Sequence, residues 1–215
     1  MEQVTIQDAR SWYSSDDPVH DFDHVLRVYR LAERLAQAEG ADLVIVRAAA
    51  LLHDSCGSAP GGGGELRAEH HLTSAEFAGQ VLREKGWNPE QIQAVQHCIR
   101  THRFRNQDEA PGSLEAKVLF DADKLDVLGA IGTARTIAYA ALDGQPVYAE
   151  PSDQFLKTRV KVPGEPHSSY HEFLFKLRNV KGRLFTESGR VLAEARHAYM
   201  VGFYQQLQAE VRGER

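Results

Sequence analysis

The pattern of apolar and polar residues predicts helices along most of the chain. Between residues 24 and 39, apolar side chains repeat every three or four positions, which buries one face of a helix before Gly40 ends it. Asn88 and Pro89 supply an N-cap and a first-turn proline for a later helix. The predicted helices are, in order, 24–39, 42–54, 73–86, 88–102, 113–128, an alanine-rich segment that ends at Gly144, 168–180 and 186–211.

Two segments between these helices are predicted to be irregular. Residues 55–69 contain four successive glycines at 61–64, which is typical of a loop, either a cover over a site or ordinary surface. Residues 146–166 form a second long connection. No segment alternates as a strand does. The sequence therefore predicts an all-α bundle in a single domain of residues 1–215, with a core at about 20–130 and a C-terminal helical extension at about 168–211.

Composition narrows the classes of protein and of partner. The chain has 215 residues, 42% of them hydrophobic, and a formal net charge of −5, which argues against nucleic acid or an anionic membrane as the main partner. The two cysteines, Cys56 and Cys98, form no C-x-x-C pair, so we expect a reducing cytoplasm. The N-terminus lacks the pattern of a signal peptide, and the most apolar stretch, 41–52, is too short to span a bilayer.

Imidazoles and carboxylates stand beside apolar helical positions in three separate segments. These are His24, the pair His53-Asp54 at the end of a buried helix, and Asp121 within a later one. A carboxylate on a buried face is costly unless it is paired or bound to a cation. Each residue alone favours a hydrogen-bonded core side chain, so the prediction of a metal site depends on the ordered set of all three segments. Two imidazoles and two carboxylates form a mixed nitrogen and oxygen site that suits a divalent metal ion.

This ordered set resembles the HD superfamily of phosphohydrolases, whose pattern is H…HD…D. The resemblance extends to the segments 20–28, 51–54, 115–118, 121–135 and 171–177, and so to nearly the whole chain. It is similar to a bacterial branch of nucleotide pyrophosphohydrolases and phosphatases. The resemblance implies an HD-domain helical bundle that hydrolyses a phosphate ester or anhydride with a metal-activated water. The implied ligands are His24, His53, Asp54 and Asp121.

A metal-dependent hydrolase needs an ion and residues that move protons. Manganese is the leading ion, with magnesium, cobalt, iron, nickel and zinc as alternatives. Asp54 and His102 are the candidate catalytic residues, with His20 as a second candidate for acid or base, because Asp54 can accept a hydrogen bond from the water and imidazole titrates near neutrality. His70 and His102 resemble the additional ligands of HD enzymes that hold two metals. The chain departs from nucleotide-cleaving HD enzymes after His53-Asp54, where it has no further carboxylate, so the general base is not carried over.

Four cations are candidate contacts for the substrate phosphate. Lys124 follows Asp121 by three residues on nearly the same helical face, whereas Lys176, Arg27 and Arg135 fit structural ion pairs equally well. The expected substrate is a small phosphate compound, most simply a nucleotide. Two alternatives stay open, a di-iron HD-fold oxygenase and a non-catalytic nucleotide-binding regulatory module. The sequence also leaves open whether the chain forms a homodimer.

Overall fold

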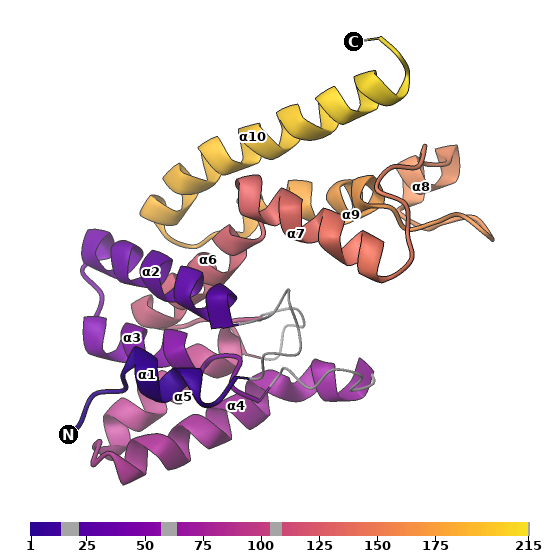
Figure 1. The fold of residues 1–215 in the computed structure, drawn as a ribbon. Helices are drawn as coiled ribbons and strands as arrows, with labels where there is room; N and C mark the ends of the chain where they lie inside the picture. Colours follow the sequence, from indigo (N-terminus) through magenta and orange to yellow (C-terminus); the bar gives the residue numbers. More distant parts are fainter. Residues whose placement is uncertain (14–21, 57–63, 104–108, 215) are drawn as a thin grey trace. The chain divides into compact units, whose positions relative to one another are not determined.

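The protein is helical throughout the part that the structure describes. The computed structural model describes residues 1–13, 22–56, 64–103 and 109–214, without the side chains of 64–69, and contains no strand in these ranges. The elements (Figure 1) are α1 (Ile6–Arg10), α2 (Phe22–Glu39), α3 (Leu43–Leu52), α4 (Gly64–Glu84), α5 (Pro89–Thr101), α6 (Leu114–Asp126), α7 (Gly129–Leu142), α8 (Asp153–Thr158), α9 (Ser169–Phe175), the 3-10 helix η1 (Leu177–Arg183) and α10 (Glu187–Val211). The all-α prediction is confirmed.

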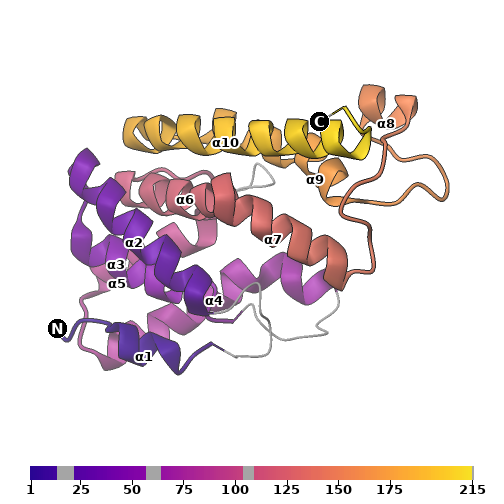
Figure 2. The same cartoon turned by 45° about the horizontal axis from the view of Figure 1, so that its top comes forward.

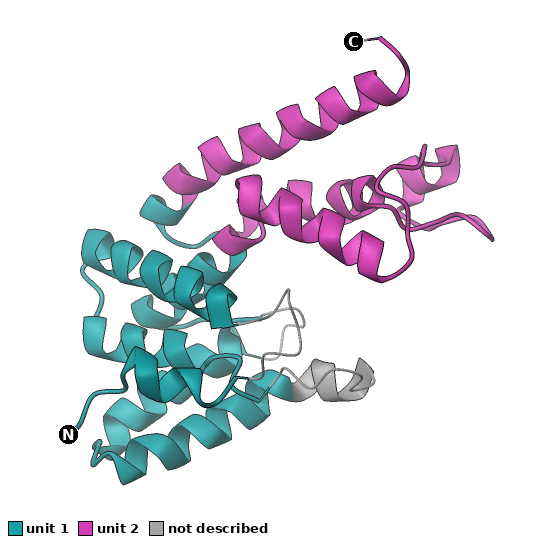
Figure 3. Cartoon of the chain, in the orientation of Figure 1, with its two compact units in different colours: residues 1–124, 184–189 teal, residues 125–183, 190–215 magenta. Residues whose placement is uncertain are grey.

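The chain divides into two compact units (Figure 3). Unit 1 consists of residues 1–124 and 184–189, and unit 2 of residues 125–183 and 190–215. Two helices belong to both units, because α6 crosses the boundary after Lys124 and α10 crosses it after Gly189. The grouping of the whole chain into one domain stays a prediction.

In unit 1, α3 is the central helix. It packs against α2 on one side and α5 on another, and α4 packs on α5 (Figures 1 and 2). Seven of its ten residues are buried, and three of these are the alanines Ala48, Ala49 and Ala50. Small side chains let neighbouring helices approach closely, and the apolar face of α2 that the sequence predicts lies buried. Because α3 is packed in this way, the residues that follow its C-terminus lie in the interior of unit 1.

The helix starts in unit 1 follow the capping chemistry of the sequence. The Asp42 side chain accepts hydrogen bonds from the backbone N–H of Val44 at 2.8 Å and of Ile45 at 3.3 Å, which fixes the start of α3. Asn88 does the same for α5 by accepting from Gln91 N–H at 2.9 Å. These contacts satisfy backbone donors that have no partner inside the helix.

Asp121 joins α6 to the start of α10 within unit 1. Its side chain is fully buried, and its Oδ2 accepts hydrogen bonds from the Thr186 backbone N–H at 2.7 Å and the Thr186 hydroxyl at 2.6 Å. Its Oδ1 accepts from the Phe185 N–H at 2.9 Å. Gly189 lies against this carboxylate, because a Cβ there would come within 2.6 Å of Oδ2. Asp121 thus stabilises the first turn of α10, where its charge also favours the positive end of the helix dipole.

Unit 2 contains α7, α8, α9, η1 and most of α10. Helix α9 packs against α7 and η1. The buried His171 anchors the start of α9, since its Nδ1 lies 2.7 Å from the Ser168 hydroxyl and its Nε2 lies 3.2 Å from Glu165 Oε1. Glu165 also accepts from the Ser152 backbone N–H at 2.7 Å. This polar cluster ties the irregular segment before α9 to the helix.

Several predicted element boundaries were wrong. Helix α4 begins at Gly64, so Thr73 lies inside the helix, where its hydroxyl donates to the His70 carbonyl at 3.1 Å instead of capping an N-terminus. Ser152 caps the short helix α8 within the segment predicted as irregular. The segment 168–180 is divided between α9 and η1. The glycines at 61–63 lie outside the described residues.

Among the described residues, no single helix is long and apolar enough to cross a membrane. Only α6 and α7 taken together meet that criterion of length and composition, and they meet at a bend of 62°.

Two glycines give a matched test of the packing in unit 2. A Cβ at Gly132 in α7 would lie 2.1 Å from the Val127 carbonyl oxygen, whereas a Cβ at Gly202 in α10 meets nothing within 4 Å. We expect Gly132→Ala to lower the free energy of unfolding by roughly 2 kcal/mol, and Gly202→Ala to raise it by up to about 1 kcal/mol through helix propensity. Urea unfolding followed by circular dichroism measures both, and equal effects of the two substitutions would contradict the packing described.

Candidate metal centre

The C-terminus of α3 delivers His53 and Asp54 to the interior of unit 1. His53 is fully buried, and its Nδ1 lies 2.8 Å from the Ala50 carbonyl oxygen. The Tyr13 hydroxyl donates to the Leu51 carbonyl at 3.0 Å, which satisfies one of the carbonyls at this helix end. Because a carbonyl can only accept, Nδ1 of His53 carries the proton and Nε2 presents a lone pair.

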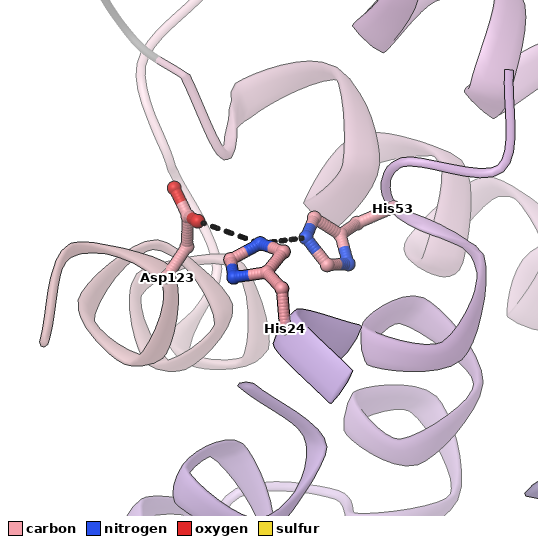
Figure 4. Close-up of side chains that lie close together, drawn as sticks. All are labelled: His24, His53 and Asp123. Carbon is pink, nitrogen blue, oxygen red and sulfur yellow. Dashed lines mark hydrogen bonds and ion pairs between the residues drawn. The ribbon is translucent and has the colours of Figure 1, made fainter. Parts of the chain in front are cut away.

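His24, in the first turn of α2, lies with its Nε2 facing Nε2 of His53. Its side chain is buried, and its Nε2 lies 3.4 Å from Nε2 of His53. Asp123 on α6 approaches from the other side, with Oδ1 3.6 Å from His24 Nε2 (Figure 4). The three residues come from the start of α2, the end of α3 and the later helix α6, and they point toward one another.

Asp54 lies between two groups of imidazoles. Its Oδ2 is 3.5 Å from His53 Nε2 and 3.8 Å from His24 Nε2. Its Oδ1 is 3.1 Å from His70 Nε2 and 3.3 Å from His102 Nε2. This Oδ1 is buried and has no hydrogen bond of acceptable geometry. A buried carboxylate oxygen without such a bond is costly unless another group, such as a cation, stabilises it.

The donor set fits a divalent cation. His24 Nε2, His53 Nε2, Asp54 Oδ2 and Asp123 Oδ1 are separated by 3.4 to 3.8 Å in the four pairs measured. Two donors bound to one tetrahedral ion at ~2.1 Å lie roughly 3.4 Å apart, so a small contraction brings these atoms to coordination distance. Two imidazoles with two carboxylates suit manganese, iron, cobalt, nickel or zinc. The same oxygen and nitrogen atoms repel one another without a positive charge between them.

The surroundings keep the ligands in their binding forms. Burial lowers the pKa of His53 to about 4, so its imidazole is neutral at pH 7. Burial raises the pKa of Asp54, but the imidazoles of His53, His102 and His70 around it outweigh this and hold that pKa well below its usual range. For Asp123, the nearby Lys124 ammonium and the histidines likewise overcome the effect of burial on the pKa and lower it. Neutral imidazoles and ionised carboxylates are the forms that bind metal.

The structure brings together most of the predicted ligands and replaces one. His24, His53 and Asp54 converge, but Asp121 does not, because its carboxylate is bonded to the start of α10. Asp123 occupies the place expected for it. Residues two apart on a helix point about 200° away from each other, so the two carboxylates of the Asp-Ala-Asp sequence cannot both face the cluster. The structure therefore places Asp123 in the cluster and Asp121 outside it, and we propose Asp123 as the ligand in place of Asp121.

The additional histidines also lie at the centre. His70 on α4 and His102 after α5 form, with Asp54, a second group whose ligand atoms lie within 4.8 Å of one another. His102 is almost fully buried, and its Nδ1 is 2.6 Å from the Ile99 carbonyl oxygen. His20, the other predicted acid or base, lies outside the described residues.

The four cations predicted to contact the substrate phosphate are divided between the two units. Lys124 donates to Asp123 Oδ2 at 2.6 Å and to the His102 carbonyl at 3.2 Å, so its ammonium supports the cluster. Arg27 is half-buried on α2, one turn after His24. In unit 2, Arg135 pairs with Asp126, and the exposed Lys176 pairs with Glu172 at 3.1 Å. Lys176 and Arg135 thus form the structural ion pairs that the sequence allowed, and Arg27 stays a prediction as a phosphate contact.

Asp121 and Asp123 give a matched test of the revised ligand set. Asp121→Asn turns an amide toward backbone donors in a buried site, so we expect it to lower the free energy of unfolding by about 3 kcal/mol while the folded protein still binds metal. Asp123→Asn should weaken metal binding at least tenfold at little cost in stability. Isothermal titration with Mn²⁺ and urea unfolding separate the two effects. Loss of metal binding in folded Asp121→Asn protein would restore Asp121 as the ligand.

Burial of His53 predicts a pH dependence of stability. The unfolded chain binds a proton at an ordinary pKa near 6.5, but the folded His53 does so only at about 4. The unfolded state therefore binds more protons between these values, and acidification from pH 7 to 4 lowers the unfolding free energy of metal-free protein by roughly 3 kcal/mol through His53. Denaturation of wild-type and His53→Gln protein across this range measures the difference. Identical pH profiles for the two proteins would contradict it.

Comparison with known proteins assigns the chain to a family. The HD domain family matches residues 21–128. Bacillus subtilis YpgQ is 32% identical over 214 residues, which cover 96% of this chain and 94% of YpgQ. The crystal structure of YpgQ in complex with ADP has a TM-score of 0.72 at 30% identity and covers 97% of this chain and 99% of that one. An HD-superfamily hydrolase from Bacillus thuringiensis has a TM-score of 0.71 at 30% identity, covering 96% and 94% of the two chains. The chain belongs to the HD-domain family.

Proposed function

We propose that this protein is a metal-dependent phosphohydrolase that cleaves a phosphate ester or anhydride bond of a nucleoside phosphate. The convergence of His24, His53, Asp54 and Asp123 carries this proposal, because two buried imidazoles and two half-buried carboxylates form a donor set for one divalent cation. Membership of the HD family and the likeness to an HD-superfamily hydrolase support hydrolysis. The ADP complex of YpgQ supports a nucleotide as the substrate.

The proposed ion acts as a Lewis acid when it is bound. A divalent cation lowers the pKa of a coordinated water from 15.7 toward about 7 and neutralises charge on a phosphoryl group. We propose Mn²⁺ as the ion, with the other first-row divalent ions and Mg²⁺ as substitutes. His24, His53, Asp54 and Asp123 would hold it, and Lys124 orients Asp123 by binding its second carboxylate oxygen.

His102 is the proposed proton acceptor. Its Nδ1 faces the Ile99 carbonyl at 2.6 Å, so Nδ1 carries the proton and Nε2 carries a lone pair. That Nε2 lies beside Asp54 Oδ1, at 3.3 Å. A water attacking phosphorus at this place loses its proton to an imidazole that the fold already holds in the accepting form. The Ile99 carbonyl then stabilises the imidazolium, since its oxygen accepts from Nδ1–H in both states.

Arg27 is the proposed contact for the substrate phosphate. It follows His24 by one turn of α2 and therefore lies toward the same end and face of that helix. A guanidinium binds two phosphate oxygens with its fork of donors, which favours a planar, bidentate contact.

Turnover of nucleotides tests the proposal directly. Purified protein with Mn²⁺, Mg²⁺ or Co²⁺ is incubated with nucleoside mono-, di- and triphosphates, and chromatography together with phosphate detection identifies the bond cleaved. We expect Asp54→Asn to reduce kcat/KM by at least about 10³-fold, because it removes a ligand and its charge. Circular dichroism should show that helical content is retained.

Asp23→Asn is the matched control for that substitution. Asp23 is an exposed carboxylate in the same turn of α2 as His24, so its neutralisation should leave kcat/KM within about twofold. Absence of turnover of every nucleotide by metal-loaded wild-type protein would reject the proposed activity. Equal losses in Asp23→Asn and Asp54→Asn would reject the proposed role of Asp54.

A further inference from the structure

The partner of each ring Nδ1 determines how the histidines around Asp54 can act. In His53 and His102, Nδ1 lies against a backbone carbonyl, of Ala50 at 2.8 Å and of Ile99 at 2.6 Å. A carbonyl accepts but never donates, so the proton sits on Nδ1 and Nε2 has a lone pair. This is the tautomer in which an imidazole binds a metal or accepts a proton through Nε2.

His70 has the opposite kind of partner. Its Nδ1 lies 2.9 Å from Nη1 of Arg103. A guanidinium carries only donors and stays protonated at every physiological pH, so Arg103 donates and Nδ1 of His70 accepts. In the neutral imidazole the proton then resides on Nε2. An Nε2 that carries a proton has no lone pair for a cation.

The Nε2–H of His70 lies at the carboxylate of Asp54. The separation between His70 Nε2 and Asp54 Oδ1 is 3.1 Å, within the range of an N–H···O hydrogen bond. In the structure, Oδ1 is buried and accepts no hydrogen bond, so the bond from His70 requires the ring or the carboxylate to rotate. The other carboxylate oxygen, Oδ2, faces His53 and His24.

We propose that Arg103 holds His70 as a hydrogen-bond donor to Asp54 Oδ1, so that His70 is a positioning residue for a metal ligand and not itself a ligand. Asp54 then binds the cation through Oδ2 while His70 fixes its orientation through Oδ1. The protein holds one cation per chain, and the expected second metal site at His70 and His102 does not form. This inference rests on the proposed metal centre but not on the identity of the substrate.

His70 and His102 differ in a way that the sequence does not reveal. His70 and His102 are both histidines close to Asp54, yet Arg103 gives one the donor form and Ile99 gives the other the acceptor form. In other metal sites, removal of a partner that orients a ligand in this way lowers the metal affinity by roughly 10- to 100-fold. We expect an effect of that size from loss of either His70 or Arg103.

Nuclear magnetic resonance reads the tautomers directly. Protein labelled with ¹⁵N-histidine is studied by long-range ¹H–¹⁵N correlation at pH 8, metal-free and with diamagnetic Zn²⁺, and the His70 signals are assigned by their loss in His70→Gln. We expect the Nε2–H tautomer for His70 in both states and the Nδ1–H tautomer for His53 and His102. An Nδ1–H tautomer for His70, or an equal mixture of the two, would overturn the proposal.

Metal counting and affinity test the same point independently. Glutamine places an amide N–H near the position of Nε2–H but offers no ring lone pair, whereas leucine offers neither. We expect one Mn²⁺ per chain in wild-type, His70→Gln and His70→Leu protein, with a dissociation constant raised 10- to 100-fold only in His70→Leu. Two ions in wild-type protein and one in His70→Gln would show that His70 is a ligand.

Arg103 has a matched control on the preceding turn. Arg100 binds the exposed Glu109 at 2.8 Å and has no place in the centre. Arg103→Met should weaken Mn²⁺ binding to the same extent as His70→Leu, and the proton of His70 should no longer be confined to Nε2. Arg100→Met should change neither the affinity nor the tautomer. Unchanged binding and an unchanged tautomer in Arg103→Met would overturn the proposal. Because these readouts need no turnover, failure of the nucleotide assay alone leaves the inference standing.

Discussion

The separation of 3.4 Å between the Nε2 atoms of His24 and His53 is the constraint on which the site depends. Both rings are buried, and the Ala50 carbonyl forces the His53 nitrogen to present a lone pair. The carboxylates of Asp54 and Asp123 approach the same place, so electron-rich atoms converge where little water can solvate them. Such an arrangement is stable when a positive charge lies among the donors, which is the physical basis for assigning a cation to this site.

The helix packing in unit 1 holds these side chains close together. The small side chains of α3 let α2 and α5 pack closely around it, and the end of α3 therefore places His53 and Asp54 next to the first turn of α2. Asp121 contributes in another way, because its bonds to Thr186 and Phe185 fix α6 against the start of α10. Asp121, which fixes α6, and Asp123, whose carboxylate faces His24, are two residues apart on the same helix.

Hydrogen bonds beyond the four donors give similar side chains different chemistry. Backbone carbonyls set His53 and His102 as acceptors, and a guanidinium sets His70 as a donor. Lys124 has a comparable effect on Asp123, since it binds one carboxylate oxygen and leaves the other toward His24. The proposed division of the site into ligands, a proton acceptor and a positioning donor thus depends on partners that are not among the proposed ligands.

The sequence by itself determined the helical class, most helix positions and the family, and it predicted three of the four proposed donors, because these depend on local periodicity, capping and short motifs. Helical spacing revealed α2 and α10, and Asn88 marked the start of α5. It did not distinguish Asp123 from Asp121, or His70 from His102, and it gave no signal for Tyr13 or Arg103. In each case a neighbour distant in the sequence decides. Thr186 donates hydrogen bonds to Asp121, and Arg103 donates to Nδ1 of His70, which leaves the ring proton on Nε2. Only the tertiary structure brings such partners together, since the direction of a side chain and the position of a proton depend on what packs against them.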